Sequence, residues 1–342
     1  MDHELYMRRC MELAQQGAGF VAPNPMVGCV IVNDGKIIGE GYHQKFGEPH
    51  AEVNAVNSVK DPSLLSRSTL YVNLEPCSHF GKTPPCADLI IAEGIPEVII
   101  GCHDPNPDVS GNGIKKLRAA HCHVHQGILE AECEELNRRF FTFHKKQRPY
   151  IILKWAQSTD GFTAPASGER MNISNEYSRT LVHRWRSEES AIMIGTNTAS
   201  RDNPALDARL WNGNNPVRVV LDRDLRLSSD LRLFDHAIRT IVITEKAKPS
   251  EKNLEFFQTN FSQELLRNVM QHLYREQLQS VLVEGGAQLL QNFIAENLWD
   301  EIRLFISPQL LHSGIAAPHF EGTRISEENI DGDRLLTFKP NG

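Results

Sequence analysis

Short apolar runs alternate with stretches of helical periodicity in residues 1–143. Apolar runs predict strands at residues 29–32, 36–41, 69–74 and 97–101. Apolar side chains at helical spacing predict helices at residues 2–17, 50–59, 87–92, 111–121 and 129–143. Asn33-Asp34-Gly35 predicts a hairpin turn between the first two strands. The alternation indicates an α/β fold in which helices cover a mixed sheet.

The same rhythm restarts after a basic, proline-terminated stretch at 144–149. Further strands are predicted at residues 150–156, 191–195, 217–222, 240–244, 280–284, 301–306 and 335–338. Further helices are predicted at residues 174–187, 265–277 and 287–297. We therefore expect two α/β domains, one spanning residues 1–146 and the other residues 147–342.

Composition narrows the class of protein. The 342 residues are 40% hydrophobic and 23% charged, which suffices for two globular cores, and the net charge of −7 argues against a broad nucleic-acid face. All seven cysteines fall in the first 133 residues in no disulfide-like pattern. With neither an apolar leader at the N-terminus nor an apolar run of about 18 residues, we expect a cytoplasmic protein outside the membrane.

One set of residues in the first half has the chemistry of a metal site. His50, Cys77 and Cys86 supply one imidazole and two thiols, which suits a tetrahedral Zn²⁺ with its fourth position left for water. The helices predicted to begin near His50 and Cys86 would meet at one end of the sheet and bring the three ligands together from two helix N-termini. The alternative is that both cysteines are small buried hydrophobes and His50 caps a helix. The other five cysteines are expected to pack in the core.

Glu52 lies two residues after the histidine, close enough to move protons without being a ligand. This layout resembles that of the zinc-dependent nucleobase deaminases, in which a glutamate beside a His/Cys/Cys metal shuttles protons. We therefore expect Glu52 to be catalytic. Without a metal beside it, Glu52 would be an ordinary carboxylate at a helix start.

The spacing of the two cysteines departs from the usual Cys-x-x-Cys, because eight residues separate Cys77 from Cys86. Together with Asn24 in Pro-Asn-Pro-Met-Val-Gly, this insertion resembles the bifunctional deaminase/reductase family of riboflavin biosynthesis. The resemblance implies a pyrimidine ribosyl phosphate as substrate, with Lys82 meeting the phosphate and with Asn24 and His43 contacting base or ribose. On their own, Asn24 reads as a turn former and Lys82 as a solvated loop charge.

In the second half, a predicted strand ends at Val283-Glu284-Gly285-Gly286 and a helix follows. Such a junction exposes backbone N–H groups to an anion, although a simple tight turn gives the same pattern. Gly-x-Gly-x-x-Gly is absent from this junction, so the usual Rossmann fingerprint is not indicated.

The resemblance sharpens this reading. The run from Lys154 to Gly161, the segment 198–206 and the segment 284–286 resemble three motifs of the family's reductase domain, which has a fold like dihydrofolate reductase. The positions that match its NADPH contacts are Ala156, Asn172, Thr198, Asp202, Gly286, Ala287 and Gln288. The positions that match its substrate contacts are Lys154, Arg170, Arg186, Leu206, Arg209 and Glu284.

The chain departs from the family pattern at two of these positions. Asn172 stands where relatives often have an aromatic residue, and Arg170 replaces a small polar one. The arginines otherwise suit a phosphate, although Arg186 on an amphipathic helix could instead be a solvated charge. Lys154 and Glu284, at strand ends, suit the opened ribose.

The leading expectation is therefore a two-site enzyme with a cytidine-deaminase-like αβα domain and a reductase domain, using Zn²⁺ and NADPH and forming a homo-oligomer. A cytidine- or tRNA-type deaminase with an accessory domain is the alternative enzyme. A binding module with structural zinc is the alternative from another class, and it would need a fourth protein ligand such as His79.

Overall fold

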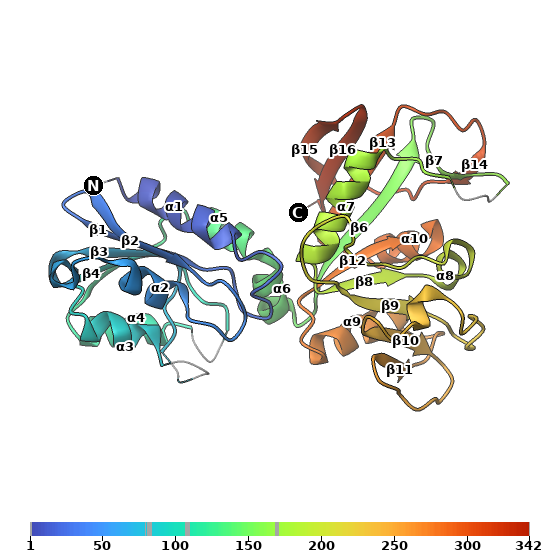
Figure 1. Cartoon of the computed structure of the whole chain (residues 1–342). Coiled ribbons are helices and arrows are strands. Elements are labelled where there is room, and N and C mark those ends of the chain that lie inside the picture. The colour runs from blue at the N-terminus through green and yellow to red at the C-terminus, as the bar shows by residue number, and fades with distance from the viewer. Residues whose placement is uncertain (1, 79, 81–83, 107–109, 168–170, 342) are drawn as a thin grey trace. The chain divides into compact units, whose positions relative to one another are not determined.

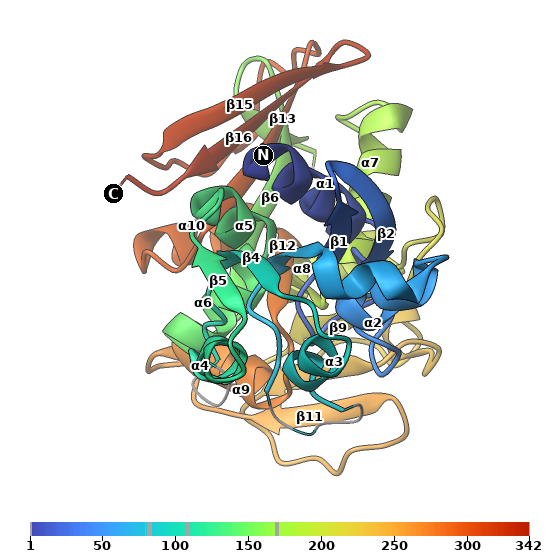
Figure 2. The same cartoon turned by 90° about the vertical axis from the view of Figure 1, so that its left-hand side faces the viewer.

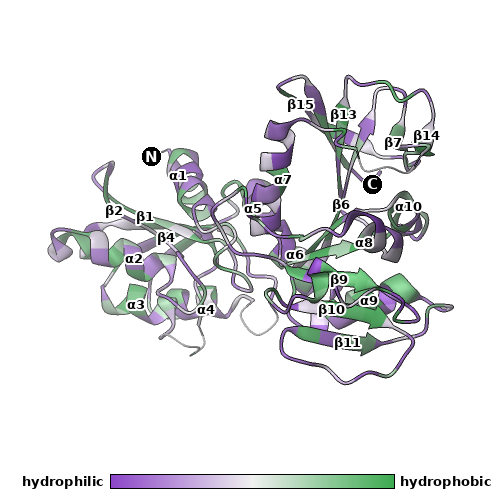
Figure 3. Ribbon diagram, turned by 45° about the vertical axis from the view of Figure 1, so that its right-hand side comes forward, coloured by the Kyte–Doolittle hydropathy of each residue, from purple (hydrophilic) through white to green (hydrophobic). Residues whose placement is uncertain are grey.

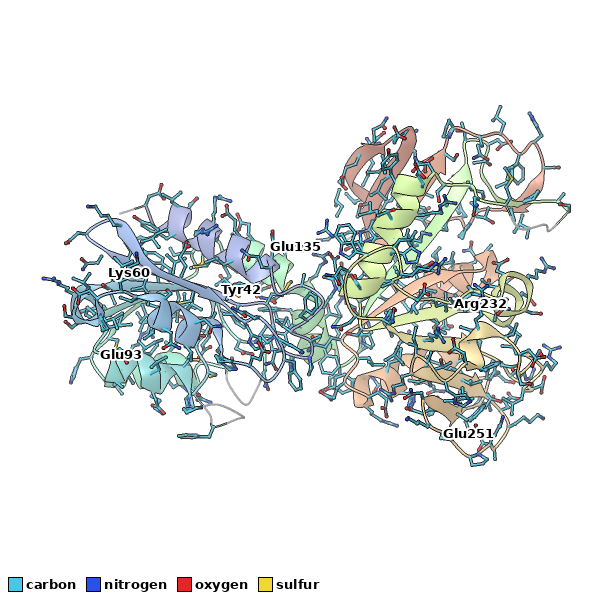
Figure 4. All side chains as sticks on the ribbon, viewed as in Figure 1. Tyr42, Lys60, Glu93, Glu135, Arg232 and Glu251 are labelled. Atoms are coloured by element: carbon cyan, nitrogen blue, oxygen red, sulfur yellow. The ribbon has the colours of Figure 1, made fainter. Side chains whose placement is uncertain are left out.

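The computed structural model describes residues 2–78, 80, 84–106, 110–167 and 171–341, which form two compact units, Met1–Lys146 (unit 1) and Gln147–Gly342 (unit 2). Many charged side chains lie on the outside of each unit, as Lys60 and Glu135 on unit 1 and Arg232 and Glu251 on unit 2 illustrate (Figure 4). None of the helices in these ranges combines the length and the apolar character that crossing a membrane requires.

Unit 1 is built on a five-stranded sheet. Its strands are β1 (Gly28–Asn33), β2 (Lys36–Tyr42), β3 (Thr69–Leu74), β4 (Glu97–Cys102) and β5 (His123–Gln126). They follow the order β2-β1-β3-β4-β5, with β1 antiparallel to both neighbours and β3, β4 and β5 parallel. Figure 2 shows β2 and β5 at opposite edges. Because β1 and β3 are buried along their whole length, both faces of the sheet must be covered.

Helices cover both faces and make a three-layer αβα unit (Figure 1). One face carries α2 (Ala51–Ser58), α3 (Cys86–Ala92) and α4 (Asn112–Ala119). The other carries α1 (His3–Gln15), α5 (Glu130–Leu136) and α6 (Arg138–Lys146). A short 3₁₀ helix, Pro62–Arg67, precedes β3.

Close packing of α2 on β2 fixes the start of that helix. A Cβ at Gly41 would lie 2.4 Å from the backbone nitrogen of Ala55, so only glycine lets β2 approach α2 this closely. Ala51 and Ala55 are completely buried on the same helix face. His50, the N-cap of α2, is thereby held at the end of the sheet.

Unit 2 is built on a nine-stranded sheet in the order β11-β10-β9-β8-β12-β6-β13-β16-β15. Its strands are β6 (Tyr150–Ser158), β8 (Ala191–Ile194), β9 (Val217–Leu221), β10 (Thr240–Thr244), β11 (Leu254–Gln258), β12 (Ser280–Gly285), β13 (Glu301–Ser307), β15 (Thr323–Ile330) and β16 (Asp333–Lys339). All pairings from β11 to β13 are parallel, and β16 and β15 complete the sheet antiparallel. A separate two-stranded sheet pairs β7 (Phe162–Pro165) with β14 (Gly314–Ala316).

The two faces of this sheet are covered differently. The largest core cluster packs α9 (Leu265–Arg275) and α10 (Ala287–Ala295) on one face. Two smaller clusters pack α7 (Glu176–Glu188) and α8 (Thr196–Asp202) on the other. In Figure 3 strands β9 and β10 are mostly hydrophobic and α7 is mostly hydrophilic, as expected of parallel strands buried between helices.

The structure confirms the αβα and α/β classes but corrects several elements. The helix expected over 129–143 is two helices, because Asn137 ends α5 and its side chain binds the backbone of Met26. The helix expected from residue 174 begins at Glu176, with Asn175 as its N-cap. The sequence did not predict α8 or five of the strands, namely β5, β7, β11, β14 and β15.

Candidate active sites

Three ligand atoms converge at one end of the sheet in unit 1. The Nδ1 atom of His50 lies 3.6 Å from Sγ of Cys77 and 3.4 Å from Sγ of Cys86, and all three ligand atoms lie within 4.8 Å of one another. A tetrahedral zinc with a Zn–S bond of about 2.3 Å and a Zn–N bond of about 2.1 Å sets N and S about 3.6 Å apart. These spacings fit a zinc ion. His50 caps α2 and Cys86 opens α3 as expected, but Cys77 comes from the loop after β3, so only two ligands stand at helix N-termini.

The thiol groups of Cys77 and Cys86 share one proton through a hydrogen bond. Hydrogen bonding with Cys86 and with His50 lowers the pKa of Cys77 to about 4, against the opposing effect of burial. The bond with Cys77, together with burial, raises the pKa of Cys86 well above its usual range. The Cys77 thiolate also accepts the backbone N–H of Cys86 at 3.3 Å. A divalent cation bound here would displace the shared proton and be held by both thiolates.

Glu52 lies on the first turn of α2, next to the three ligands. Its side chain is almost completely buried, at 3% exposed. Burial, reinforced by the nearby Cys77 thiolate, raises the pKa of Glu52 above its ordinary value. A raised pKa brings a buried carboxyl group closer to the range in which it can both take up and release a proton. This is the environment that a proton shuttle requires.

Asn24 and His43, both predicted to contact substrate, lie together beside His50. The amide nitrogen of Asn24 is 3.1 Å from Nε2 of His43, and the His43 and His50 rings meet edge to face at 5.3 Å. Nδ1 of His43 lies 3.1 Å from the carbonyl of Pro49. Burial lowers the pKa of His43, so the ring is neutral, donating to Pro49 and accepting from Asn24. A polar wall therefore stands beside the metal ligands.

Two asparagines that sequence reasoning missed hold this wall in place. Asn73, fully buried on β3, accepts the N–H of Gly28 and donates to the carbonyl of Met26. Asn137 both accepts from and donates to Met26. The turn that carries Asn24 is thus fastened from two distant parts of the chain. No local pattern signals this role.

A buried carboxylate, Glu75, was also missed. It accepts backbone N–H groups from four residues that lie beyond β4, at 3.0–3.4 Å: Asp104, Gly111, Gly113 and Ile114. Glu75, which lies two residues before Cys77 in the sequence, thereby anchors the start of α4. Burial raises the pKa of Asp104 to about 7. The sequence feature that could have revealed Glu75 is its position directly before Pro76-Cys77.

In unit 2, a cavity of about 740 Å³ lies at the carboxyl ends of β6, β8, β9 and β12. Its walls include nine predicted site residues: Lys154, Ala156, Asn172, Thr198, Asp202, Glu284, Gly286, Ala287 and Gln288. This edge of an open parallel sheet is where such folds bind ligands. The structure therefore brings together all seven predicted cofactor residues and two of the predicted substrate residues.

The start of α10 suits the diphosphate of a dinucleotide. Gly286 is its N-cap and has no side chain to bind the free N–H groups of the first turn, at Ala287 and Gln288. The N–H of Gly286 donates to the hydroxyl of Thr198 at 3.0 Å, which fixes α8 against α10. A Cβ on Gly286 would lie 3.2 Å from that hydroxyl oxygen. The N–H donors on this wall fit the diphosphate of a dinucleotide.

A buried group of charges lies beside this helix start. Arg186 on α7 binds Glu284 on β12 through two N–H···O bonds of 2.7 Å each. Although burial opposes ionisation of Glu284, Arg186 outweighs it and lowers the pKa of the carboxyl to about 2. Burial lowers the pKa of Lys154, whose charge the nearby Glu284 supports. The Arg186 guanidinium, expected to meet a phosphate, is therefore already neutralised by Glu284.

The remaining predicted substrate residues lie elsewhere. Leu206 is 2% exposed in a core cluster, and Arg209 is exposed and pairs with Asp207, so neither lines the cavity. Lys82 and Arg170 lie outside the described residues, as does His79. His183 on α7 was missed; it is buried near Arg186, has no partner for Nδ1 within the described ranges, and its pKa falls to about 4 through burial.

Comparisons with known proteins match each unit to a protein family. A model of the RibD C-terminal domain matches residues 149–340, and a model of the cytidine and deoxycytidylate deaminase zinc-binding region matches residues 1–102. The riboflavin biosynthesis protein RibD of Aquifex aeolicus (strain VF5) is 40% identical over 98% of this chain and 97% of its own length. The chain belongs to the RibD family.

Two further relatives support membership of this family. The RibD protein of Actinobacillus pleuropneumoniae is 42% identical over 90% of this chain and 84% of its own length. A crystal structure from Thermotoga maritima, of a diaminohydroxyphosphoribosylaminopyrimidine deaminase/5-amino-6-(5-phosphoribosylamino)uracil reductase, is 39% identical and superposes with a TM-score of 0.91 over 99% of both chains. Family membership confirms the expected resemblance and fold classes, with a zinc-binding deaminase region in unit 1 and a RibD reductase domain in unit 2.

Proposed function

We propose that this chain carries out two consecutive steps of riboflavin biosynthesis. The first is hydrolytic deamination of 2,5-diamino-6-ribosylamino-4(3H)-pyrimidinone 5′-phosphate, and the second is NADPH-dependent reduction of the ribosyl group to a ribityl chain. Membership of the RibD family makes the chain a deaminase and a reductase of this pathway. We further propose that the chain acts on this particular substrate, uses Zn²⁺ and NADPH, and associates with itself.

Support for the deaminase step comes chiefly from three ligand atoms at zinc spacing beside a buried glutamate. When bound, zinc supplies the Lewis acidity that makes water a nucleophile near neutral pH. Glu52 carries one proton to the ring nitrogen and a second to the departing amine. A C–O bond forms, the exocyclic C–N bond breaks and ammonia leaves. Asn24 and His43 orient the ring.

Support for the reductase step comes from the wall of the cavity in unit 2. When bound, NADPH supplies the hydride. The free N–H groups at the start of α10 bind its diphosphate. Lys154, midway along β6, and Glu284, near the end of β12, interact electrostatically and both line the cavity, where they orient the hydroxyls of the opened ribose so that C1′ faces the cofactor.

Both steps are tested by incubating zinc-loaded protein with the pyrimidinone phosphate and NADPH while ammonia release and NADPH absorbance are followed separately. We expect one NADPH oxidised for each ammonia released. Ammonia without NADPH oxidation would leave only the deaminase step. Ammonia from cytidine but none from the pyrimidinone would support the alternative, a cytidine-type deaminase.

A further inference from the structure

The cavity in unit 2 carries free positive charge on its walls. Three arginines line it: Arg179 from α7, Arg201 from α8 and Arg226 from the turn after β9. Within the described ranges, no side-chain hydrogen bond or ion pair is found for any of the three, and all are exposed. Arg186, by contrast, is committed to Glu284. Unpaired guanidinium groups beside a cavity are available to an anionic ligand.

The neighbours of Arg226 in the same turn are already paired. Arg223 binds Glu245 at 2.9 Å, and Asp224 lies 3.6 Å from Lys246. The turn itself is well fixed, because the buried carboxylate of Asp222 accepts the N–H groups of Arg226 and Leu227 at 2.9 and 3.0 Å. Arg226 therefore combines a fixed backbone with a guanidinium that has no partner within the described ranges. Arg223, in the same turn, is already paired.

The order of the strands gives the direction in which a dinucleotide would lie. The cavity edge runs from β9 through β8 and β12 to β6. The free N–H groups of α10 follow β12, and Lys154 belongs to β6. If the diphosphate binds at α10 and the nicotinamide faces Lys154, the adenosine half extends towards β8 and β9. Arg201, in the last turn of the helix that follows β8, and Arg226, in the turn after β9, both line this side of the cavity, whereas Arg179 belongs to α7.

We propose that Arg201 and Arg226 bind the 2′-phosphate of NADPH and make the reductase select NADPH over NADH. This selectivity rests on the proposed use of a nicotinamide cofactor. A guanidinium matches a phosphate dianion through paired N–H···O bonds, whereas the 2′-hydroxyl of NADH gives it no charge to neutralise. Asp202, which also lines this wall, is suited to a ribose hydroxyl and would not favour a phosphate.

Binding of NADP⁺ and of NAD⁺ to the full chain, measured by isothermal titration calorimetry, tests these roles without catalysis. Arg201→Ala and Arg226→Ala should each weaken NADP⁺ binding about ten- to hundredfold, the worth of a charged hydrogen bond, and change NAD⁺ binding less than about twofold. Arg201→Lys and Arg226→Lys should lose less, because the charge remains. Arg223→Ala, an exposed residue of the same turn paired with Glu245, is the matched control and should change neither.

Equal losses for both nucleotides, or unchanged NADP⁺ binding in both alanine variants, would overturn the role of these arginines. Wild-type protein that binds NAD⁺ as tightly as NADP⁺ would refute only the selectivity and leave the proposed reductase standing. Wild-type protein that binds neither would refute the nicotinamide cofactor itself. Circular dichroism of each variant, expected to match the wild type, separates lost binding from lost folding.

Discussion

Two buried glutamates of this chain stand in opposite environments. Glu52 lies beside a thiolate and the metal ligands, and burial raises the pKa of its carboxyl group. Glu284 is also buried, but the guanidinium of Arg186 and the nearby Lys154 lower its pKa to about 2. The carboxyl group of Glu52 is therefore shifted towards its protonated form, whereas that of Glu284 is held as an anion. In the proposed function, the same residue type serves proton transfer in unit 1 and fixed charge in unit 2.

The role of Glu52 is tested by Glu52→Gln, which keeps the shape of the side chain and removes its ability to carry a proton. We expect zinc content to remain at one ion per chain and ammonia release to fall about 10²- to 10⁴-fold, the usual contribution of a positioned acid–base group. Metal analysis and an ammonia assay measure the two quantities. Full deamination by this variant would rule out Glu52 as the shuttle.

The Arg186–Glu284 pair makes a prediction about stability and pH. Arg186→Met leaves Glu284 buried without its hydrogen-bonded partner and with only the more remote Lys154 and His183 to offset its charge among the described residues, so unit 2 should lose roughly 3 kcal/mol or more at pH 7. The folded pKa of Glu284 is about 2, below its ordinary value of 4.5, so the stabilisation is complete above about pH 5 and is lost as the pH falls towards 2. The difference between the two proteins should shrink over that range.

Thermal unfolding followed by circular dichroism between pH 7 and pH 3 measures this difference. Arg184→Met is the matched control on the same helix, because Arg184 is half exposed and pairs with Glu188 across one helical turn. It should change the free energy of unfolding by less than about 0.5 kcal/mol. A variant of Arg186 no less stable than this control would contradict the importance of the buried pair.

Single residues differ in how far the sequence reveals them. His50, Glu52, Cys77 and Cys86 are recognisable because their spacing and chemistry are read along a short segment. Asn137 is not, because its partner Met26 lies 111 residues away and only the folded chain brings them together. The pairing of Arg186 with Glu284 spans 98 residues and was likewise hidden, so the sequence suggested a phosphate for a guanidinium that already has an anion.

At the scale of elements, both candidate sites depend on how helix starts are fastened to strand ends. In unit 1 the N-termini of α2 and α3 carry two ligands, and Glu75 ties the start of α4 to the segment that carries the third. In unit 2 Thr198 ties α8 to the start of α10. Helices with an apolar face were predicted from their periodicity. The polar helix α8 and the largely exposed strand β15 were not, because neither shows an apolar pattern.

Glu75→Ala should loosen unit 1 at this junction. The substitution leaves several buried N–H groups of the 104–114 segment without an acceptor, which should cost about 2 kcal/mol or more. Urea unfolding of the zinc-loaded protein measures the loss, and zinc content should fall as well. Glu93→Ala, at the end of α3, is the control and should be nearly neutral. Equal stability of the two variants would show that Glu75 does not anchor α4.

Thr198→Val removes the hydroxyl that accepts the N–H of Gly286 and keeps the side-chain volume. Losing one neutral hydrogen bond at the start of α10 should weaken NADP⁺ binding about three- to tenfold and leave deamination unchanged. Calorimetry and the ammonia assay measure these effects. Thr180→Val, on α7 and away from the cavity wall, should bind NADP⁺ as the wild type does. Unchanged binding by Thr198→Val would dissociate this contact from the cofactor.

At the scale of the whole molecule, one chain carries two αβ units with unlike chemistry. Unit 1 offers three residues that could hold a metal ion and a proposed proton carrier, whereas unit 2 offers helix N–H groups and fixed charges. Alternating apolar patterns predicted both fold classes, since parallel strands and their covering helices leave a strong periodic signal. They could not predict the two antiparallel strands of the separate sheet, β7 and β14, which are short and half exposed.

In the proposed function the two sites act in order, because unit 1 deaminates the substrate before unit 2 reduces it. NADPH absorbance, recorded with wild type and with Glu52→Gln on the diaminopyrimidinone phosphate and on its deaminated product, tests this most directly. Wild type should oxidise NADPH with either compound, whereas Glu52→Gln should oxidise it only with the deaminated one. Oxidation of NADPH by Glu52→Gln with the diaminopyrimidinone, at the wild-type rate, would contradict the order, and no oxidation by the wild type with either compound would contradict the reductase.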